Sequence, residues 1–168
     1  MASLQKITPC LWFDTEAEEA ARFYASIFPD AAIERVARYG KEGFDVHGKP
    51  AGSVLTVSFQ LLGQPFMALN GGPHFKFSEV VSFILYCADQ AEIDRYWAAL
   101  GEGGDAKAQQ CGWLKDRFGL SWQIVPRELP GMMSAADGAR SERVMKALLP
   151  MKKLDLAALK RAYEGAPS

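Results

Sequence analysis

The strongest constraint on the fold is a pattern that occurs twice: an apolar segment followed by an amphipathic helix. The first copy runs from the apolar residues 7–13 into a helix whose apolar positions recur at helical spacing as far as Phe28. The second copy runs from residues 80–88 into a helix that Gly101 ends. Internal repetition of this kind predicts two modules built in the same way.

Both helices begin with a pattern typical of a capping box. Thr15 is followed three residues later by Glu18, and Asp89 is followed by Glu92 at the same spacing. We also expect the carboxylate of Asp14 to act as a helix cap. The two strand-to-helix connections are therefore predicted to be alike.

The segments after the helices are also paired. Strands are predicted near residues 32–38, 54–60 and 66–69 in the first half, and near 111–116 and 121–125 in the second. Alignment of Gly63 with Gly119 places Met67 on Gln123. We predict an α+β fold in which a single domain, 1–168, contains two βαβββ modules, 1–75 and 76–130, that form a cupped mixed sheet.

The remaining segment, 131–168, is predicted to be a short helical appendage. A loop over 130–138 leads to a helix that Ser141 caps and Pro150 ends. A second helix covers about 156–164 and ends at Gly165. We expect this appendage to be a lid or a dimer contact.

Composition excludes several classes of partner. The chain has 19 Lys and Arg against 20 Asp and Glu, so it lacks the basic surface that binding to nucleic acid or to an anionic membrane requires. Its three cysteines, Cys10, Cys87 and Cys111, form no CxxC pair, which favours a reduced, cytoplasmic setting. No apolar window approaches the roughly 18 residues of a membrane span.

The chain resembles the vicinal oxygen chelate superfamily of glyoxalase I, bleomycin-resistance proteins and extradiol dioxygenases. Within it, the chain is similar to the PhnB-like branch, whose members are often labelled 3-demethylubiquinone-9 3-methyltransferase-like. The similarity lies in residues 8–13, 20–24, 27–29, 66–73, 110–126 and 143–165. It implies paired βαβββ modules, a cupped sheet and a homodimer, but no single reaction.

Catalytic members of this superfamily hold one divalent metal in the cup. The resemblance places their ligand positions at Pro9, Met67, Ser82 and Gln123, of which Gln123 alone offers a suitable oxygen. His47 and His74 lie in loops and are expected to be surface residues. We predict no metal and no cofactor. The alternative is a metal-dependent lyase, isomerase or dioxygenase whose ligands lie elsewhere.

Other chemistries have weaker support. The chain has no GxGxxG turn for S-adenosylmethionine, so whether it is an enzyme stays open. Cys10 and Cys87 are expected to be core residues, and Cys111 is expected to be structural. Asp116 either orients a ligand or pairs with Arg117 or Lys115, and Glu79 has no assigned role.

Strand alternation predicts the lining of the cup. If Pro9, Met67, Ser82 and Gln123 face it, other alternate residues accompany them, whereas Trp12, Phe66, Phe83 and Trp122 face the helices. The accompanying residues are Leu11, Phe13, Leu69, Ile84, Tyr86 and Val125. The predicted ligand-binding residues are Pro9, Leu11, Met67, Leu69, Ser82, Tyr86, Trp113 and Gln123.

This lining suits a small apolar or aromatic molecule held by a few hydrogen bonds. No catalytic residue is assigned. The alternative is that the same side chains fill the cup as core, in a structural or interaction protein that binds no ligand.

Overall fold

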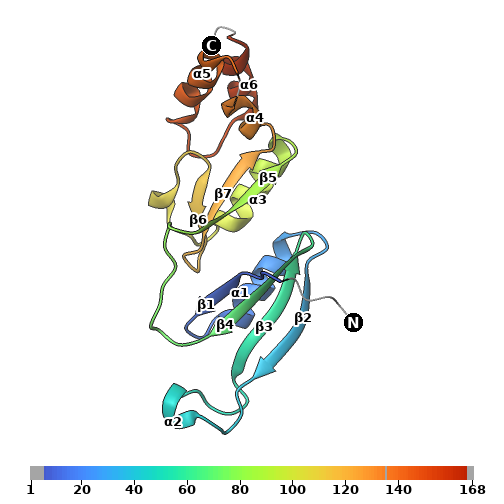
Figure 1. The fold of residues 1–168 in the computed structure, drawn as a ribbon, viewed down its shortest axis with the longest axis vertical. Coiled ribbons are helices and arrows are strands. Elements are labelled where there is room, and N and C mark those ends of the chain that lie inside the picture. The colour runs from blue at the N-terminus through green and yellow to red at the C-terminus, as the bar shows by residue number, and fades with distance from the viewer. Residues whose placement is uncertain (1–5, 135, 166–168) are drawn as a thin grey trace. The chain divides into compact units, whose positions relative to one another are not determined.

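The computed structural model describes residues 6–134 and 136–165. The chain divides into two compact units, Met1–Lys76 and Phe77–Ser168, each with its own sheet (Figure 1). The α+β fold with mixed sheets is confirmed. No helix in the described ranges is long and apolar enough to cross a membrane.

The first unit is a four-stranded mixed sheet with one long helix. Its elements are β1 (Cys10–Phe13), α1 (Ala17–Ile27), β2 (Ala32–Arg38), α2 (Phe44–His47), β3 (Val54–Leu61) and β4 (Gln64–Asn70). The strand order is β1-β4-β3-β2, and β1 pairs with β4 in parallel while the other pairs are antiparallel. This is the βαβββ module that the sequence predicts, with a short helix added between β2 and β3.

The core of the first unit lies between the sheet and α1. Alternate residues of β3 and β4 are buried against the helix, and the ring of Phe59 stacks on that of Tyr24 with centroids 6.3 Å apart. On the helix, Ala17, Ala20 and Ala21 are buried at the spacing of one face. These small side chains allow the helix to approach the sheet closely.

The predicted capping box of α1 is wrong. The N-cap is Glu16 and makes no side-chain capping bond. Instead, the Ala17 N–H donates to Oδ1 of Asn70, which lies buried at the end of β4, at 2.8 Å. Asp14 is not a cap either, because its side chain pairs with Lys49. The cap comes from a residue far away in the sequence, which the residues around the start of α1 do not reveal.

The second unit contains a smaller sheet. Its elements are β5 (Ser82–Cys87), α3 (Gln90–Gly101), η1 (Ala106–Ala108), β6 (Trp113–Lys115), β7 (Ser121–Pro126), α4 (Leu129–Met133), α5 (Gly138–Leu148) and α6 (Leu156–Glu164). The strand order is β5-β7-β6, with β5 parallel and β6 antiparallel to β7. This module therefore has one strand fewer than the βαβββ pattern predicts, since a 3₁₀ turn occupies the segment after α3.

The capping box of α3 is confirmed. The carboxylate of Asp89 accepts from the Glu92 N–H at 2.9 Å, and Oε2 of Glu92 accepts from the Ala88 N–H at 2.8 Å. Ile93, Tyr96 and Leu100 form the buried face of the helix against the sheet. The connection between β5 and α3 is thus fixed by residues within a few positions of one another.

The C-terminal helices differ in part from their predicted bounds. The segment expected to be a loop contains α4, and α5 is capped by Asp137, not by Ser141. The carboxylate of Asp137 accepts from the Ala139 N–H at 3.0 Å. The prediction for α6 is confirmed, including its end at Gly165, whose φ of 76° closes the helix.

Candidate functional site

The second sheet has one face that α3 does not cover, which we call the open face of the second sheet. Strand register places on it Ser82, Ile84, Tyr86, Trp113, Lys115, Ser121, Gln123 and Val125. The alternate residues on the helix side are buried from Leu85 to Cys87 in β5 and throughout β7, and Phe83 is half-buried. The predicted alternation of β5 and β7 is therefore confirmed.

Two polar side chains meet on this face. Nε2 of Gln123 donates to Oγ of Ser82 at 2.9 Å. Ser121 is the strand partner of Ser82, and it is 1% exposed with no hydrogen-bond partner for its hydroxyl oxygen among the described residues. The three residues form a small, uncharged polar cluster.

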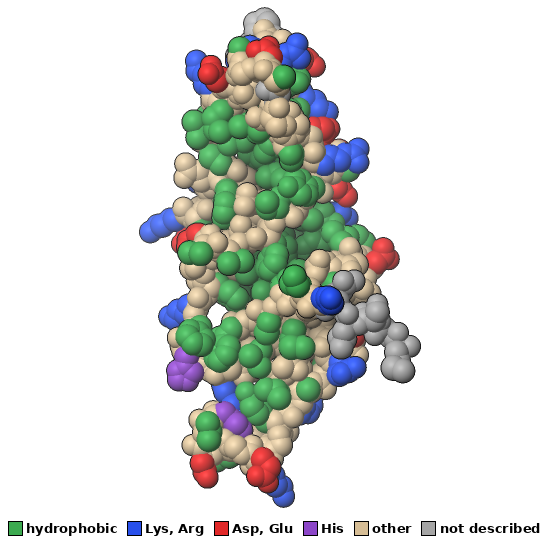
Figure 2. Space-filling model, in the orientation of Figure 1, with side chains coloured by type: hydrophobic (Ala, Val, Ile, Leu, Met, Phe, Trp, Pro, Cys, Tyr) green, Lys and Arg blue, Asp and Glu red, His purple; other side chains and the backbone are tan. Residues whose placement is uncertain are grey.

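The surroundings of this cluster are apolar and partly exposed. Ile84 and Tyr86 are alternate residues of β5 on this face, and they are 48% and 53% exposed. Trp113 on β6 is the strand partner of Gln123. In the view of Figure 2, hydrophobic side chains gather over the region of the second sheet. The arrangement offers apolar contact area beside a few hydrogen-bonding groups.

The charged side chain on the open face is already paired. Nζ of Lys115 lies 2.5 Å from Oε1 of Glu79, which assigns a role to that glutamate. The hydrogen bond from Lys115 lowers the pKa of the Glu79 carboxyl below its ordinary value. Glu79 therefore stays ionised at neutral pH and compensates the lysine.

Asp116 is buried and serves the turn between β6 and β7. Its carboxylate accepts from the N–H groups of Phe118 and Leu120 at 2.9 and 3.1 Å, and from Nε1 of Trp122 at 2.9 Å. Trp122 lies on the helix side of the sheet. These contacts give the carboxylate a role in holding the turn, which is neither the ligand orientation nor the pairing with Arg117 or Lys115 that the sequence suggested.

The open side of the first sheet has a different lining from the predicted one. Leu11 and Phe13 are 5% and 4% exposed on the helix side, so their predicted placement beside Met67 is wrong. Cys10 and Trp12 pair with Met67 and Leu69 instead. The alternation of β1 is shifted by one residue, which removes Leu11 from the open side.

Two further predicted residues lie at or next to β1. Pro9 precedes β1, and its carbonyl accepts from the Met67 N–H at 2.9 Å. The predicted core position of Trp12 is wrong, since its Nε1 donates to the Gly72 carbonyl at 2.8 Å and its ring contacts Phe75 edge-on. Of the predicted residues in the first unit, Met67 and Leu69 share this side.

The donors on the two sheets do not fit a divalent metal. The first sheet presents the thiol of Cys10 and the thioether of Met67, and the second presents a hydroxyl and an amide. Mg²⁺, Ca²⁺ and Mn²⁺ prefer several oxygen ligands that include carboxylates, and Zn²⁺ and Fe²⁺ are also held by imidazole. No group of three or more His, Cys, Asp or Glu that could hold a metal occurs in residues 6–134 and 136–165.

His47 is the last residue of the short helix α2 and so does not lie in a loop as expected, whereas His74 does. Nδ1 of His47 accepts from the Lys49 N–H at 2.9 Å, its Nε2 lies 3.1 Å from the Glu42 carbonyl, and its ring contacts Tyr39. His74 is exposed. His47 therefore shapes the loop between β2 and β3.

The cysteines have different environments. Cys87 is fully buried, and burial raises its pKa to about 12. The predicted core position of Cys10 is wrong, since the residue is exposed, and partial desolvation raises the pKa of its thiol. Sγ of Cys111 lies 3.4 Å from the Leu149 carbonyl.

We expect iodoacetamide at pH 8 to modify Cys10 and Cys111 and to leave Cys87 unmodified. With a pKa of about 12, only about one in ten thousand Cys87 side chains is a thiolate at that pH, and the residue is buried. Peptide mapping by mass spectrometry checks this, with urea-unfolded protein as the control in which all three react. Alkylation of native Cys87 at the rate of Cys10 would contradict it.

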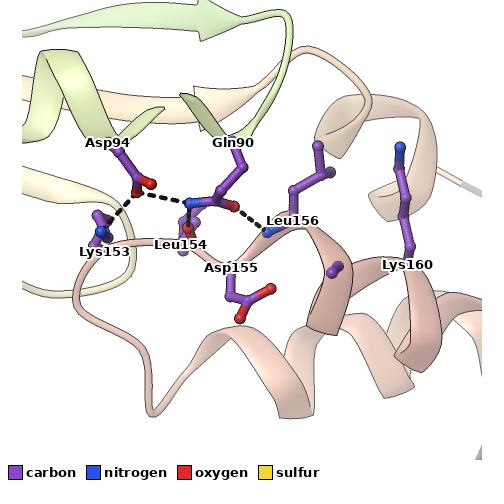
Figure 3. A pocket seen from close by; sticks show the side chains of 8 residues that line it. Gln90, Asp94, Lys153, Leu154, Asp155, Leu156 and Lys160 are labelled. Carbon is purple, nitrogen blue, oxygen red and sulfur yellow. Dashed lines mark hydrogen bonds and ion pairs between the residues drawn. The ribbon is translucent and has the colours of Figure 1, made fainter. Parts of the chain in front are cut away.

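The pocket in Figure 3 lies where the C-terminal segment meets α3. The side chain of Gln90 accepts from the Leu156 N–H at 2.8 Å and donates to the Leu154 carbonyl at 3.1 Å and to Asp94 at 3.0 Å. Lys153 pairs with Asp94, and Lys160 pairs with Glu128. The polar groups of Gln90, Lys153 and Lys160 attach the C-terminal segment to the rest of the second unit. We therefore interpret this pocket as part of that attachment.

The sequence did not predict the structural roles of Asn70 and Gln90 or the burial of the Ser121 hydroxyl. Asn70 and Gln90 form hydrogen bonds with residues that are distant in the sequence. The burial of Ser121 depends on the packing of the folded chain. A polar residue at the end of an apolar strand, as at Asn70, is the signal that could have found the first. For Gln90 and Ser121 no local signal exists.

Comparison with known proteins gives a consistent result. A sequence model of the family described as 3-demethylubiquinone-9 3-methyltransferase matches residues 5–125. A solved structure described as a putative 3-demethylubiquinone-9 3-methyltransferase, a PhnB protein from Bacillus cereus, is 32% identical, with a TM-score of 0.62. That match covers 72% of this chain and 99% of the other.

A second structure, of protein PA1353 from Pseudomonas aeruginosa, is 24% identical with a TM-score of 0.56, and the match covers 74% of this chain and 98% of the other. It supports the fold alone. A comparison with curated protein sequences found no match. The family match ends at Val125, so it does not extend to residues 143–165, where the sequence also suggested a resemblance.

Proposed function

Since the chain belongs to the 3-demethylubiquinone-9 3-methyltransferase family, the PhnB-like branch of the vicinal oxygen chelate superfamily, we propose that it binds a small organic molecule without a metal. The ligand is largely apolar or aromatic, and it lies on the open face of the second sheet. The predicted residues Ser82, Tyr86, Trp113 and Gln123 contact it.

One observation carries this proposal: large apolar side chains are exposed around a polar pair on one sheet face. Ile84 and Tyr86 are each about half exposed beside the hydrogen-bonded Ser82 and Gln123. Small-molecule sites in proteins combine apolar walls with a few placed polar groups. An aromatic ligand would cover the exposed side chains and use the polar pair for orientation.

Metal-dependent catalysis is the main alternative, because the superfamily uses a metal in its catalytic members. The side chains at the open faces argue against it, since a thiol, a thioether, a hydroxyl and an amide make a poor ligand set for a hard cation. Metal analysis of protein purified without nickel resin or chelator separates the two functions. A stoichiometric divalent metal would favour the enzyme.

Methyl transfer, which the family description names, has little support in this chain. Enzymes that bind S-adenosylmethionine in the usual way need a glycine-rich turn between a strand and a helix. Here Asp14, Thr15 and Glu16 connect β1 to α1, and Ala88 and Asp89 connect β5 to α3. Neither connection contains a glycine.

We expect the protein to be a homodimer and to be cytoplasmic. Relatives in the branch imply a homodimer, and light scattering tests this directly. The three cysteines are free of disulfides, which is consistent with the expected cytoplasmic setting.

Substitution of Tyr86 by Ala is expected to weaken binding of naphthalene-type ligands about tenfold. The ring is 53% exposed, so its loss removes ligand contact while leaving the core intact. A tenfold change corresponds to about 1.4 kcal/mol, a reasonable value for one aromatic contact. Isothermal titration calorimetry in EDTA measures it, since the proposed binding needs no metal.

The control is Val46→Ala in α2 of the first unit, where the side chain is 91% exposed and belongs to neither sheet. It should leave affinity unchanged. Equal affinities of the Tyr86→Ala variant and the unmodified protein would contradict the placement of the site. Absence of binding by any aromatic compound in a thermal-shift screen would contradict the function itself.

A further inference from the structure

We infer that the open face of the second sheet selects an uncharged ligand whose polar edge carries a hydrogen-bond acceptor next to a donor, as a carboxamide does. This inference rests on the proposed function and names the chemical class of its ligand. It follows from three observations: the direction of the hydrogen bond between Gln123 and Ser82, the ion pair of Lys115, and the apolar side chains next to Gln123.

The direction of the hydrogen bond between Gln123 and Ser82 determines which donor and which acceptor remain available to a ligand. Because Nε2 of Gln123 donates to Oγ of Ser82, the Ser82 hydroxyl keeps its own proton for another acceptor. Oε1 of Gln123 accepts from no group among the described residues. The pair therefore presents one donor, on Ser82, and one acceptor, on Gln123.

A carboxamide matches this pair. Its carbonyl oxygen can accept from the Ser82 hydroxyl while its N–H donates to Oε1 of Gln123. A ketone satisfies the hydroxyl alone, and a carboxylate has no proton for the Gln123 oxygen. The pair thus distinguishes three ligands that have almost the same shape.

The neighbouring hydroxyl supports a polar but uncharged site. Ser121 lies beside Ser82 in the sheet, is 1% exposed, and has no partner for its oxygen in the described part of the chain. A buried polar group without a partner is unfavourable and uncommon in folded proteins. Its presence here extends the polar cluster without adding a charge.

Charge on this face disfavours an anion. Lys115 is the charged side chain that the strand register places here, and its ammonium group lies 2.5 Å from the Glu79 carboxylate. An anionic ligand would have to displace Glu79 or approach a pair that is already neutral. An uncharged ligand meets no such competition.

The apolar part of the ligand is aromatic by the same reasoning. Trp113 lies next to Gln123 across the β6–β7 pairing, and Ile84 flanks Gln123 across the β5–β7 pairing. A flat ring attached to the carboxamide would contact both while its polar edge reaches Ser82 and Gln123. Aromatic rings of this kind give apolar contact with little loss of conformational freedom.

Calorimetric titration with 2-naphthamide, 2-acetonaphthone and 2-naphthoate tests this. We expect the amide to bind about fivefold more tightly than the ketone, the value of one net hydrogen bond, and at least about tenfold more tightly than the carboxylate. The Gln123→Met variant should bind amide and ketone equally. The Gln64→Met variant, altered at an exposed glutamine of the first unit, should keep the preference.

The outcomes separate the inference from the function it rests on. Equal binding of all three probes would overturn the inference and leave the proposed function standing. Tightest binding of the carboxylate would also overturn it, because Lys115 would then recruit the ligand. Tightest binding of the ketone would overturn it as well, because the Gln123 amide would then have the opposite orientation. If none of the probes binds, both the inference and the proposed function fail.

Discussion

Substitution of Asp116 by Ala should destabilise the protein by about 3–5 kcal/mol, which is a large part of the stability of an ordinary domain. The buried carboxylate accepts from two backbone N–H groups and from the indole of Trp122. Alanine leaves all three donors without that partner in a site where water does not replace it. Urea unfolding followed by circular dichroism measures the change.

Two further variants serve as comparisons for Asp116→Ala. Asp137→Ala removes a carboxylate that is 58% exposed and caps α5, so it should destabilise by about 1 kcal/mol. Asp116→Asn keeps an acceptor oxygen but adds donors next to the indole, and its effect should lie between the two. A loss below about 1 kcal/mol for Asp116→Ala would show that the three hydrogen bonds contribute little.

Substitution of Gly104 by Ala should have a comparably large effect. A Cβ atom at this position would overlap the backbone carbonyl oxygen of Lys115. Backbone cannot move aside as a flexible side chain can, so the turn after α3 must separate from β6. We expect a loss of about 3 kcal/mol or more, the size of other severe packing defects.

Gly131→Ala is the matched control, because this glycine lies within α4 and a Cβ atom added to it would meet no atom within 4 Å. It should be neutral or stabilising by up to about 1 kcal/mol. Unfolding curves of the two variants should therefore move in opposite directions or differ widely. If Gly104→Ala is as stable as Gly131→Ala, the close approach of this turn to β6 is wrong.

Local patterns predicted most of the fold. The repeated strand and helix, the capping box at Asp89 and Glu92, and the bounds of α6 all depend on residues a few positions apart. The cap of α1 could not be predicted in this way, because Asn70 reaches Ala17 only after the sheet has formed. The segment after α3 forms the 3₁₀ helix η1 and not a strand, so the second module has one strand fewer than predicted.

The two sides of β5 and β7 follow the predicted alternation, whereas those of β1 do not, for a single geometric reason. The start of the helix does not fix the register of the strand before it, because α1 begins seven residues after Cys10 and α3 begins six residues after Ile84. Cys10 and Ile84 occupy the same register position, opposite Met67 and Gln123. The predicted register was therefore one residue off in β1, which exchanged the two sides of that strand.

The central claim is that a small aromatic molecule binds on the open face of the second sheet without a metal. It is tested most directly by the indole N–H signals in a ¹H–¹⁵N NMR titration with 2-naphthamide in excess EDTA. We predict that the Trp113 signal shifts in a saturable way while the signal of Trp122, buried on the opposite side of the sheet, stays in place. An unchanged Trp113 signal, or binding that appears only after a divalent metal is added, would contradict the claim.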